Sequence, residues 1–202
     1  DYWSSWFGSR IKLYYINNPS IWKLPLGALH MLDVFFPATR KIFSKKRIFP
    51  CAKAEILMSY LSLDKTYSDR KYYDIALKIG DELIHSSTET KFGIGWGLPY
   101  KWITPNGNLS INTPNIVQTS HCFHALRQLY QQTNSDRYRI ILKKIVNFVY
   151  KDLEMGKVDG DIAPSKYGYN YPVVTFNTIA LRIHILMSAF DIFQNDEYYK
   201  KL

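Results

Sequence analysis

Apolar residues recur at intervals of three or four along most of the chain, a spacing that places them on one face of an α-helix. In the run from Ile21 to Phe36, this spacing is shared by Trp22, Leu26, Leu29, Leu32 and Phe36. Pro37 marks the end of that helix, and Pro25 is expected near its first turn, where a missing N–H is tolerated. The pattern predicts further helices from about Pro50 to Leu63 and after Ser68-Asp69.

The helical pattern repeats along the chain. Each copy has the end of one helix, a short polar turn with an aspartate as the expected N-cap, a tyrosine and the start of the next helix. Tyr72, Tyr138 and Tyr198 occupy the same place in successive copies, about 60 to 66 residues apart. The repeat predicts an all-α fold of antiparallel helical hairpins that forms a single domain over residues 1–202, with almost no β-structure beyond short pairings in the loops.

Two long loops interrupt the helices, at residues 86–114 and 156–171, and both are rich in glycine, proline and aromatic residues. Both follow the second helix of a hairpin, so in a stacked array they should emerge at the same end. Their aromatic side chains have two interpretations, because they could plug the end of the bundle or line a cleft and stack on sugar rings. The residues concerned are Trp96, Tyr100, Trp102, Tyr167, Tyr169 and Tyr171.

Composition indicates a globular chain of 202 residues, with 47% hydrophobic and 16% aromatic residues. Charge or proline breaks every long apolar run, so we expect no transmembrane helix. The N-terminus lacks the features of a signal peptide and begins with aspartate, which suggests a trimmed chain or a fragment. Cys51 and Cys122 each lie in a helical pattern and are predicted to be buried free thiols. A reducing, cytoplasmic location is expected.

The net charge is +9. Such a charge suits nucleic acid, an anionic membrane surface or an acidic polymer. The densest basic cluster spans residues 40–47, where it is either a solvated connection or a polyanion contact. No nucleic-acid-binding motif accompanies it, so we expect no nucleic-acid partner.

Three segments together resemble a known superfamily: GWGLPYKW at 95–102, TPNIVQTSHCFHALRQLYQQTNSDRY at 113–138 and VTFNTIALRI at 174–183. They are similar to the (α/α)-toroid proteins of the six-hairpin glycosidase superfamily, and in particular to uncharacterised members from bacterial lipopolysaccharide and capsule biosynthesis loci. The resemblance extends from about Pro37 to Leu202. It implies a partial (α/α)6 toroid, either an N-terminal half or a shortened relative. In it, the loop positions are Trp96, Tyr100 and Trp102, and the helix positions are Thr119, Ser120, His124 and Asn177.

The resemblance departs from the family pattern at His121, Cys122 and Phe123, where small and apolar residues are usual. It implies glycoside hydrolase, polysaccharide lyase or uronate epimerase activity on a cell-surface polysaccharide or its precursor. Hydrolysis commonly needs two opposed carboxylates, and Asp159 and Asp161 are neighbours in one loop, where solvated side chains are the plainer interpretation. Proton abstraction next to a uronate carboxylate needs only a Tyr, His or Lys base, and an anionic polymer suits the positive charge.

The predicted catalytic residues are His121, His124 and Tyr100, and the predicted substrate-binding residues are Trp96, Trp102, Thr119, Tyr167, Tyr169 and Asn177. His121 and His124 share a helix face and could be hydrogen-bonded inside the bundle or could bind a metal. A metal site would need further ligands nearby, and we expect neither metal nor cofactor. Thr119, His121 and Asn177, near helix starts, should converge with Trp102 on one pocket, where unpaired N–H groups favour an anion. The competing hypothesis is a non-catalytic helical-repeat module that binds a partner protein or another copy.

Overall fold

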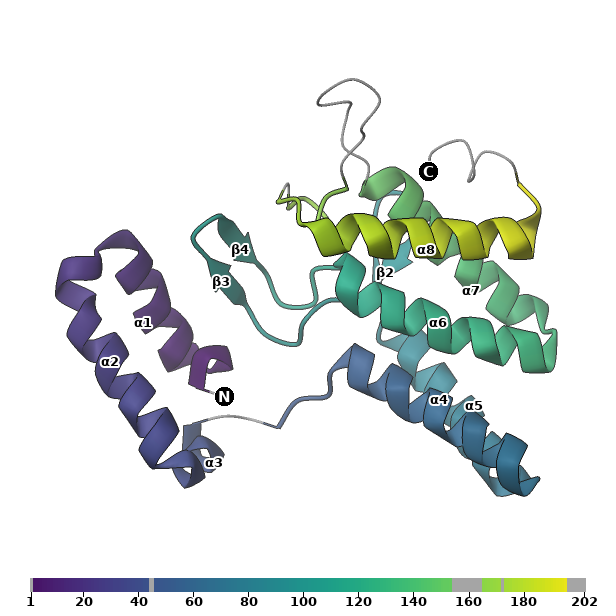
Figure 1. The fold of residues 1–202 in the computed structure, drawn as a ribbon, viewed down its shortest axis with the longest axis horizontal. Coiled ribbons are helices and arrows are strands. Elements are labelled where there is room, and N and C mark those ends of the chain that lie inside the picture. The colour runs from purple at the N-terminus through teal and green to yellow at the C-terminus, as the bar shows by residue number, and fades with distance from the viewer. Residues whose placement is uncertain (1, 44–45, 154–164, 172, 196–202) are drawn as a thin grey trace. The chain divides into compact units, whose positions relative to one another are not determined.

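The computed structural model describes residues 2–43, 46–153, 165–171 and 173–195. Eight α-helices and two small antiparallel β-sheets make up the described part of the chain (Figure 1). Its residues divide into two compact units, although the sequence predicts one domain. The first unit contains residues 1–48 and 98–112, and the second contains residues 49–97 and 113–202. The chain therefore passes from one unit to the other three times.

The first unit is a helical hairpin with a β-hairpin. A short 3-10 helix, η1 (Tyr2–Ser4), leads into α1 (Trp6–Asn17), which packs against α2 (Pro19–Phe35). Two short helices follow, η2 (Pro37–Thr39) and α3 (Arg40–Phe43). The β-hairpin consists of β3 (Trp102–Thr104) and β4 (Gly107–Leu109), and β3 contacts α1.

The predicted helix from Ile21 to Phe36 is confirmed as α2, with one difference at its start. It begins two residues earlier, at Pro19, where the fixed backbone of proline suits the first helical position. Pro25 consequently lies inside the helix and not in its first turn. Its neighbour α1 was not predicted, because its apolar residues are mixed with exposed aromatic ones.

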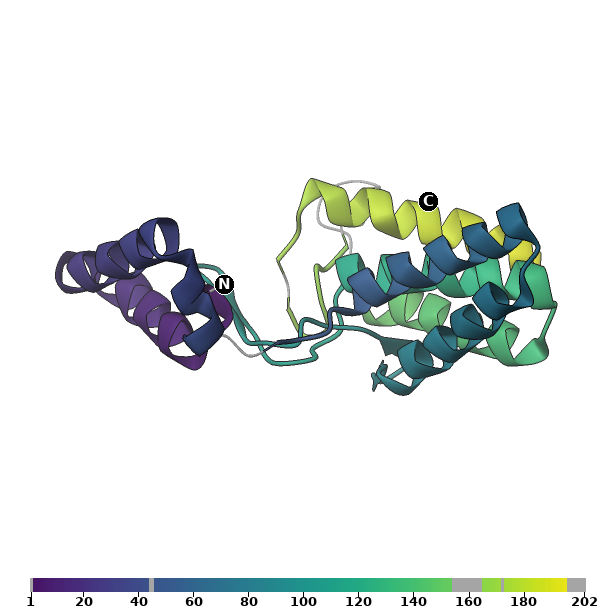
Figure 2. The same ribbon diagram turned by 90° about the horizontal axis from the view of Figure 1, so that it is seen from below.

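The second unit stacks helical hairpins. Its first hairpin pairs α4 (Pro50–Tyr67) with α5 (Arg70–His85), and its second pairs α6 (Ile116–Thr133) with α7 (Asp136–Asn147). A π-helical turn, η3 (Phe148–Asp152), extends α7, and α8 (Phe176–Phe193) follows. In Figures 1 and 2, α4, α6 and α8 lie side by side and run in the same direction, with α5 and α7 in a second layer. The prediction of a mainly α-helical architecture is confirmed, and the two small sheets in the described residues are short pairings within the first loop, as predicted.

The cap of the first hairpin and the tyrosine repeat confirm two details of the prediction, whereas in the second hairpin the N-cap is Ser135 and not the predicted aspartate. The Asp69 side chain accepts a hydrogen bond from the Lys71 N–H at the start of α5, as an N-cap does. Tyr72 and Tyr138 are each the third residue of the second helix in their hairpins. Tyr198 lies outside the described residues. The equivalence of the first two copies explains how a repeated sequence builds a continuous core.

The core of the second unit lies between its two helical layers and includes Leu57, Leu83, Leu129, Leu142 and Ile185. The first loop is fastened to it by Asp152 in η3. This carboxylate accepts hydrogen bonds from the Thr90 hydroxyl at 2.6 Å and from the Phe92 N–H at 3.2 Å. Here the loop forms a small sheet from β1 (Thr88–Glu89) and β2 (Ile94–Gly95). Loop residues that look irregular in the sequence are therefore part of the packed interior.

Both cysteines are free thiols. Cys122 on α6 is fully buried, and Cys51 in the first turn of α4 is half-buried. Burial raises the pKa of the Cys122 thiol well above its usual value. The prediction of two free thiols is confirmed, with full burial only for Cys122.

Candidate functional site

Three of the five histidines of the chain lie on the layer formed by α4, α6 and α8. His121 and His124 come from α6 and His184 comes from α8. His121 Nδ1 lies 2.7 Å from Glu55 Oε1 on α4, and the rings of His124 and His184 are 4.4 Å apart between centroids. We call Glu55, His121, His124 and His184 the histidine row. It joins three helices that are far apart in sequence.

The sequence predicts that His121 and His124 share a helix face, but in the structure the two side chains contact different neighbouring helices. Residues three apart in an α-helix differ by roughly 60° around its axis. That rotation is sufficient for His121 to reach α4 while His124 reaches α8. The pair therefore bridges both helix contacts of α6.

His121 and Glu55 form an exposed pair, with 43% and 54% of their side chains accessible. An ionised carboxylate can only accept hydrogen bonds, so the Nδ1 atom of His121 carries the proton that it shares with Glu55. In neutral histidine the Nε2 atom is then the proton acceptor. An exposed ion pair of this kind adds little to stability, at about 0–1 kcal/mol. Its main effect is to fix the tautomer and orientation of an accessible imidazole.

His124 has a different environment. Burial, followed by the neighbouring His184 and Arg127, lowers the pKa of His124 to about 4. It is therefore neutral at pH 7 and can donate or accept a proton through a hydrogen bond. One turn further along α6, the Arg127 Nη1 donates to the Ser188 hydroxyl at 3.0 Å, and its Nη2 lies 3.7 Å from the Asp191 carboxylate. The row and the adjacent Arg127 thus bring together an exposed imidazole, a neutral imidazole and a guanidinium.

Trp96 and Thr119 are packed inside the second unit and have no exposed surface. The indole Nε1 of Trp96 donates to the Leu83 carbonyl at 2.8 Å, and its backbone N–H donates to Thr119 Oγ1 at 3.0 Å. A buried indole with its polar group satisfied has no face on which a sugar could stack. The substrate-binding roles predicted for these two residues therefore have no accessible surface to support them. Trp96 is therefore a packing residue of the core, which is the first of the two interpretations of the loop aromatics.

The described part of the second loop lies beside the start of α6. The Ile116 N–H donates to the Tyr167 carbonyl at 3.0 Å, and the Tyr169 N–H donates to the Pro114 carbonyl at 2.8 Å. These bonds confirm that residues 165–171 meet the end of the first loop. Tyr167 and Tyr169 are half-buried there. Asp159 and Asp161 lie outside the described residues.

Asn177 is exposed at the second position of α8. Its side-chain oxygen accepts a hydrogen bond from the Thr175 hydroxyl. Asn177 and Tyr167 flank the starts of α8 and α6, whereas the histidine row begins further along these helices. The predicted convergence of Thr119, His121 and Asn177 is not seen, because Thr119 is enclosed and His121 turns toward α4.

Tyr100 and Trp102 belong to the first unit, and both are half-buried there. The Arg47 guanidinium lies 5.6 Å from the centre of the Tyr100 ring. Burial raises the pKa of Tyr100, and Arg47 opposes this effect only in part. A raised pKa keeps the phenol protonated at neutral pH, so little of the phenolate that a general base requires is present at Tyr100.

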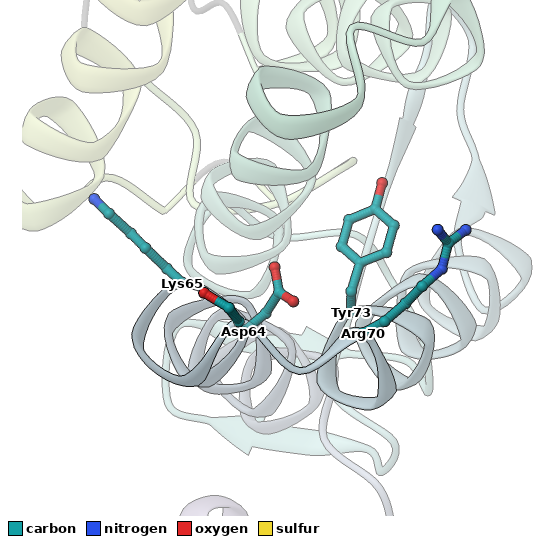
Figure 3. Close-up of a pocket in the computed structure, with 5 residues that line it drawn as sticks. Asp64, Lys65, Arg70 and Tyr73 are labelled. Atoms are coloured by element: carbon teal, nitrogen blue, oxygen red, sulfur yellow. The ribbon is translucent and has the colours of Figure 1, made fainter.

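Hollows away from the predicted residues include two of different character. One, of about 660 Å³, surrounds the turn between α4 and α5 and is lined by Asp64, Lys65, Ser68, Arg70 and Tyr73 (Figure 3). In Figure 3 the ends of Lys65 and Arg70 point away from each other, so they do not converge on one anion. The other, of about 320 Å³, lies in the first unit and has a mostly apolar lining that includes Trp3, Tyr15 and Leu26. We place the candidate site at the histidine row because imidazoles, the commonest general acid–base groups in proteins, meet a carboxylate and one another there.

Sequence reasoning identified His121 and His124 but missed Glu55, His184 and Arg127. The rarity of histidine was the available signal, because the row contains most of the histidines in the chain. Within the described residues, no three His, Cys, Asp or Glu side chains are grouped so that they could hold a metal ion. The sequence matches no protein-family model and no curated protein.

Proposed function

We propose that this chain is a carbohydrate-active protein built as part of an (α/α) toroid, acting on an anionic cell-surface polysaccharide or its precursor. The layers of the second unit support the toroid, because α4, α6 and α8 run in the same direction and form one layer. In such a toroid, this layer faces the centre and α5 and α7 face outward. The resemblance of residues 95–138 and 174–183 to toroid proteins of lipopolysaccharide and capsule loci supports the substrate class.

The histidine row is the observation that carries the proposal. His121 is the proposed base, because its Nε2 is the proton acceptor while its Nδ1–H donates a hydrogen bond to the Glu55 carboxylate. His124 and Arg127 lie one and two helical turns further along α6. A neutral imidazole and a guanidinium are suited to hold the carboxylate and hydroxyl groups of a uronate next to that base. The reaction proposed is proton abstraction beside the carboxylate, as in an epimerase or a lyase.

A uronate exchange experiment tests this proposal. The full chain is incubated in D2O with a panel of uronate-containing oligosaccharides and matched neutral ones, and proton exchange at the carbon next to the carboxylate is followed by NMR. Exchange is expected only with uronates. His121→Ala should slow it by about 10²–10⁴-fold, the range for loss of a general base. Glu55→Gln should cause a smaller loss because the imidazole remains.

His85→Ala is the matched control, because His85 is an exposed histidine at the end of α5, outside the row. It should retain wild-type exchange. Binding of uronates without exchange would limit the protein to carbohydrate binding. Absence of both binding and exchange across the panel would contradict the proposal, as would full activity in His121→Ala.

A further inference from the structure

The first unit holds most of the positive charge of the chain. Residues 1–48 and 98–112 contain nine lysines and arginines but only two aspartates, a net charge of +7 out of +9. Asp33 is the one acidic residue in the part of this unit that the structure describes, and Arg40 Nε pairs with it at 2.6 Å. The unit therefore presents a strongly positive surface, suited to an anionic partner.

Helix α2 has two apolar faces. Trp22, Leu26 and Leu29 form the inner face and pack in the small core with Ile11 of α1. The outer face is exposed, at 83% for Leu24 and 64% for Phe35. Its members recur at helical spacing and form the outer stripe, which we define as Ile21, Leu24, Ala28, Met31, Leu32 and Phe35. A stripe of this length on a folded surface indicates an interaction site.

The surroundings of the outer stripe are also apolar, aromatic and basic. Phe36, Ile42 and Phe43 are exposed just beyond the end of α2. Lys41 and Lys46 are exposed among them, and Lys23 is exposed in α2 itself. Apolar and basic side chains therefore occur together over one short stretch of chain.

We propose that the outer stripe and its basic neighbours dock on an anionic membrane surface. A bilayer interface accepts large apolar and aromatic side chains, while lysines and arginines contact lipid phosphates and acidic headgroups. Nucleic acid would use the charge but leave the apolar stripe in water. No helix in the described part of the chain is long and apolar enough to cross a bilayer. α2 would thus lie in the plane of the interface.

Vesicle flotation of the full chain tests this proposal. Vesicles of phosphatidylcholine alone are compared with vesicles that also contain phosphatidylglycerol, at low and high salt. Binding is expected only to the anionic vesicles and should weaken with salt. Leu24→Glu together with Phe35→Glu should weaken it by more than about tenfold, because both charges would enter the interface. Lys41→Glu together with Lys46→Glu should have a similar effect through lost attraction.

Ile140→Glu is the matched control, because Ile140 is 59% exposed on α7 of the second unit. It should bind vesicles like the wild type, and circular dichroism checks that each variant is folded. Three results would overturn the proposal. These are no binding to anionic vesicles at low salt, unchanged binding in the Leu24 and Phe35 double variant, and a wild-type dimer that this variant dissociates. The last result would show that a second copy covers the stripe.

Discussion

The two units of this chain use apolar helices in different ways. In the second unit, α6 buries nine of its residues, including polar ones, inside a core shared by all its neighbours. In the first unit, α2 is more apolar than α6, yet Leu29 alone is fully buried. The comparison shows that apolar content does not predict burial. Burial depends on how many elements surround a helix, and α2 has too few within its own unit.

The largest loss of stability should come from replacing a buried tryptophan, and an exposed tryptophan provides the comparison. Trp96 has no exposed surface in the second unit, and Trp6 is 69% exposed in the first. Trp96→Ala is expected to lower the free energy of unfolding by about 3–5 kcal/mol through the cavity it leaves. Trp6→Ala should change it by less than about 0.5 kcal/mol. Urea unfolding measures both, and equal losses would remove the distinction between the units.

Two glycines provide the next comparison. A Cβ atom added at Gly93 would lie 2.0 Å from the Lys144 carbonyl oxygen, whereas one added at Gly27 in α2 would meet nothing within 4 Å. Gly93→Ala should cost about 3 kcal/mol, because backbone must move to make room. Gly27→Ala should stabilise the protein by up to about 1 kcal/mol, since alanine favours the helix. Thermal unfolding of both variants tests this. A stable Gly93→Ala protein would contradict the tight loop packing.

The smallest effect should be seen in the pH dependence of stability. The pKa of His124 is about 4 instead of the usual 6.5. Between these two pKa values, His124 binds a proton in the unfolded chain but not in the folded chain. Above pH 6.5 this difference has no effect, and as the pH drops toward 4 it lowers the free energy of unfolding. This loss in the free energy of unfolding is on the order of 1–3 kcal/mol. His124→Gln should remove it from urea unfolding curves measured across this window.

His30→Gln is the control for this experiment, because His30 is exposed on α2 of the first unit. It is expected to keep the wild-type dependence on pH. If the two variants behave alike, burial of His124 does not contribute to the acid sensitivity of the protein.

Much of the fold follows from local chemistry. Pro50 and Asp69 begin their helices as predicted, because a proline at the first position and an aspartate cap act within a few residues. Tyr72 and Tyr138 match because each hairpin repeats the same turn. The division into two units was not predicted, since it depends on contacts between residues distant in sequence.

The site was harder to predict than the helices. Glu55 meets His121, and His184 meets His124, across helices more than fifty residues apart in sequence. Such pairs depend on the register between helices, which periodicity does not specify. Trp96 was misleading for a different reason. An aromatic residue between glycines is typical both of a binding loop and of a loop folded into the core, and only tertiary packing distinguishes them.

The triple crossing of the chain between its units affects how the protein is made. During synthesis, α1 and α2 leave the ribosome well before β3 and β4, which complete the same unit from residues 98–112. The helical hairpin of α1 and α2 cannot pack with these strands until α4 and α5 have also been translated. In that interval α1 lacks the strand that covers it, and α2 already displays its outer stripe. The first unit therefore cannot be completed before most of residues 98–112 have been translated.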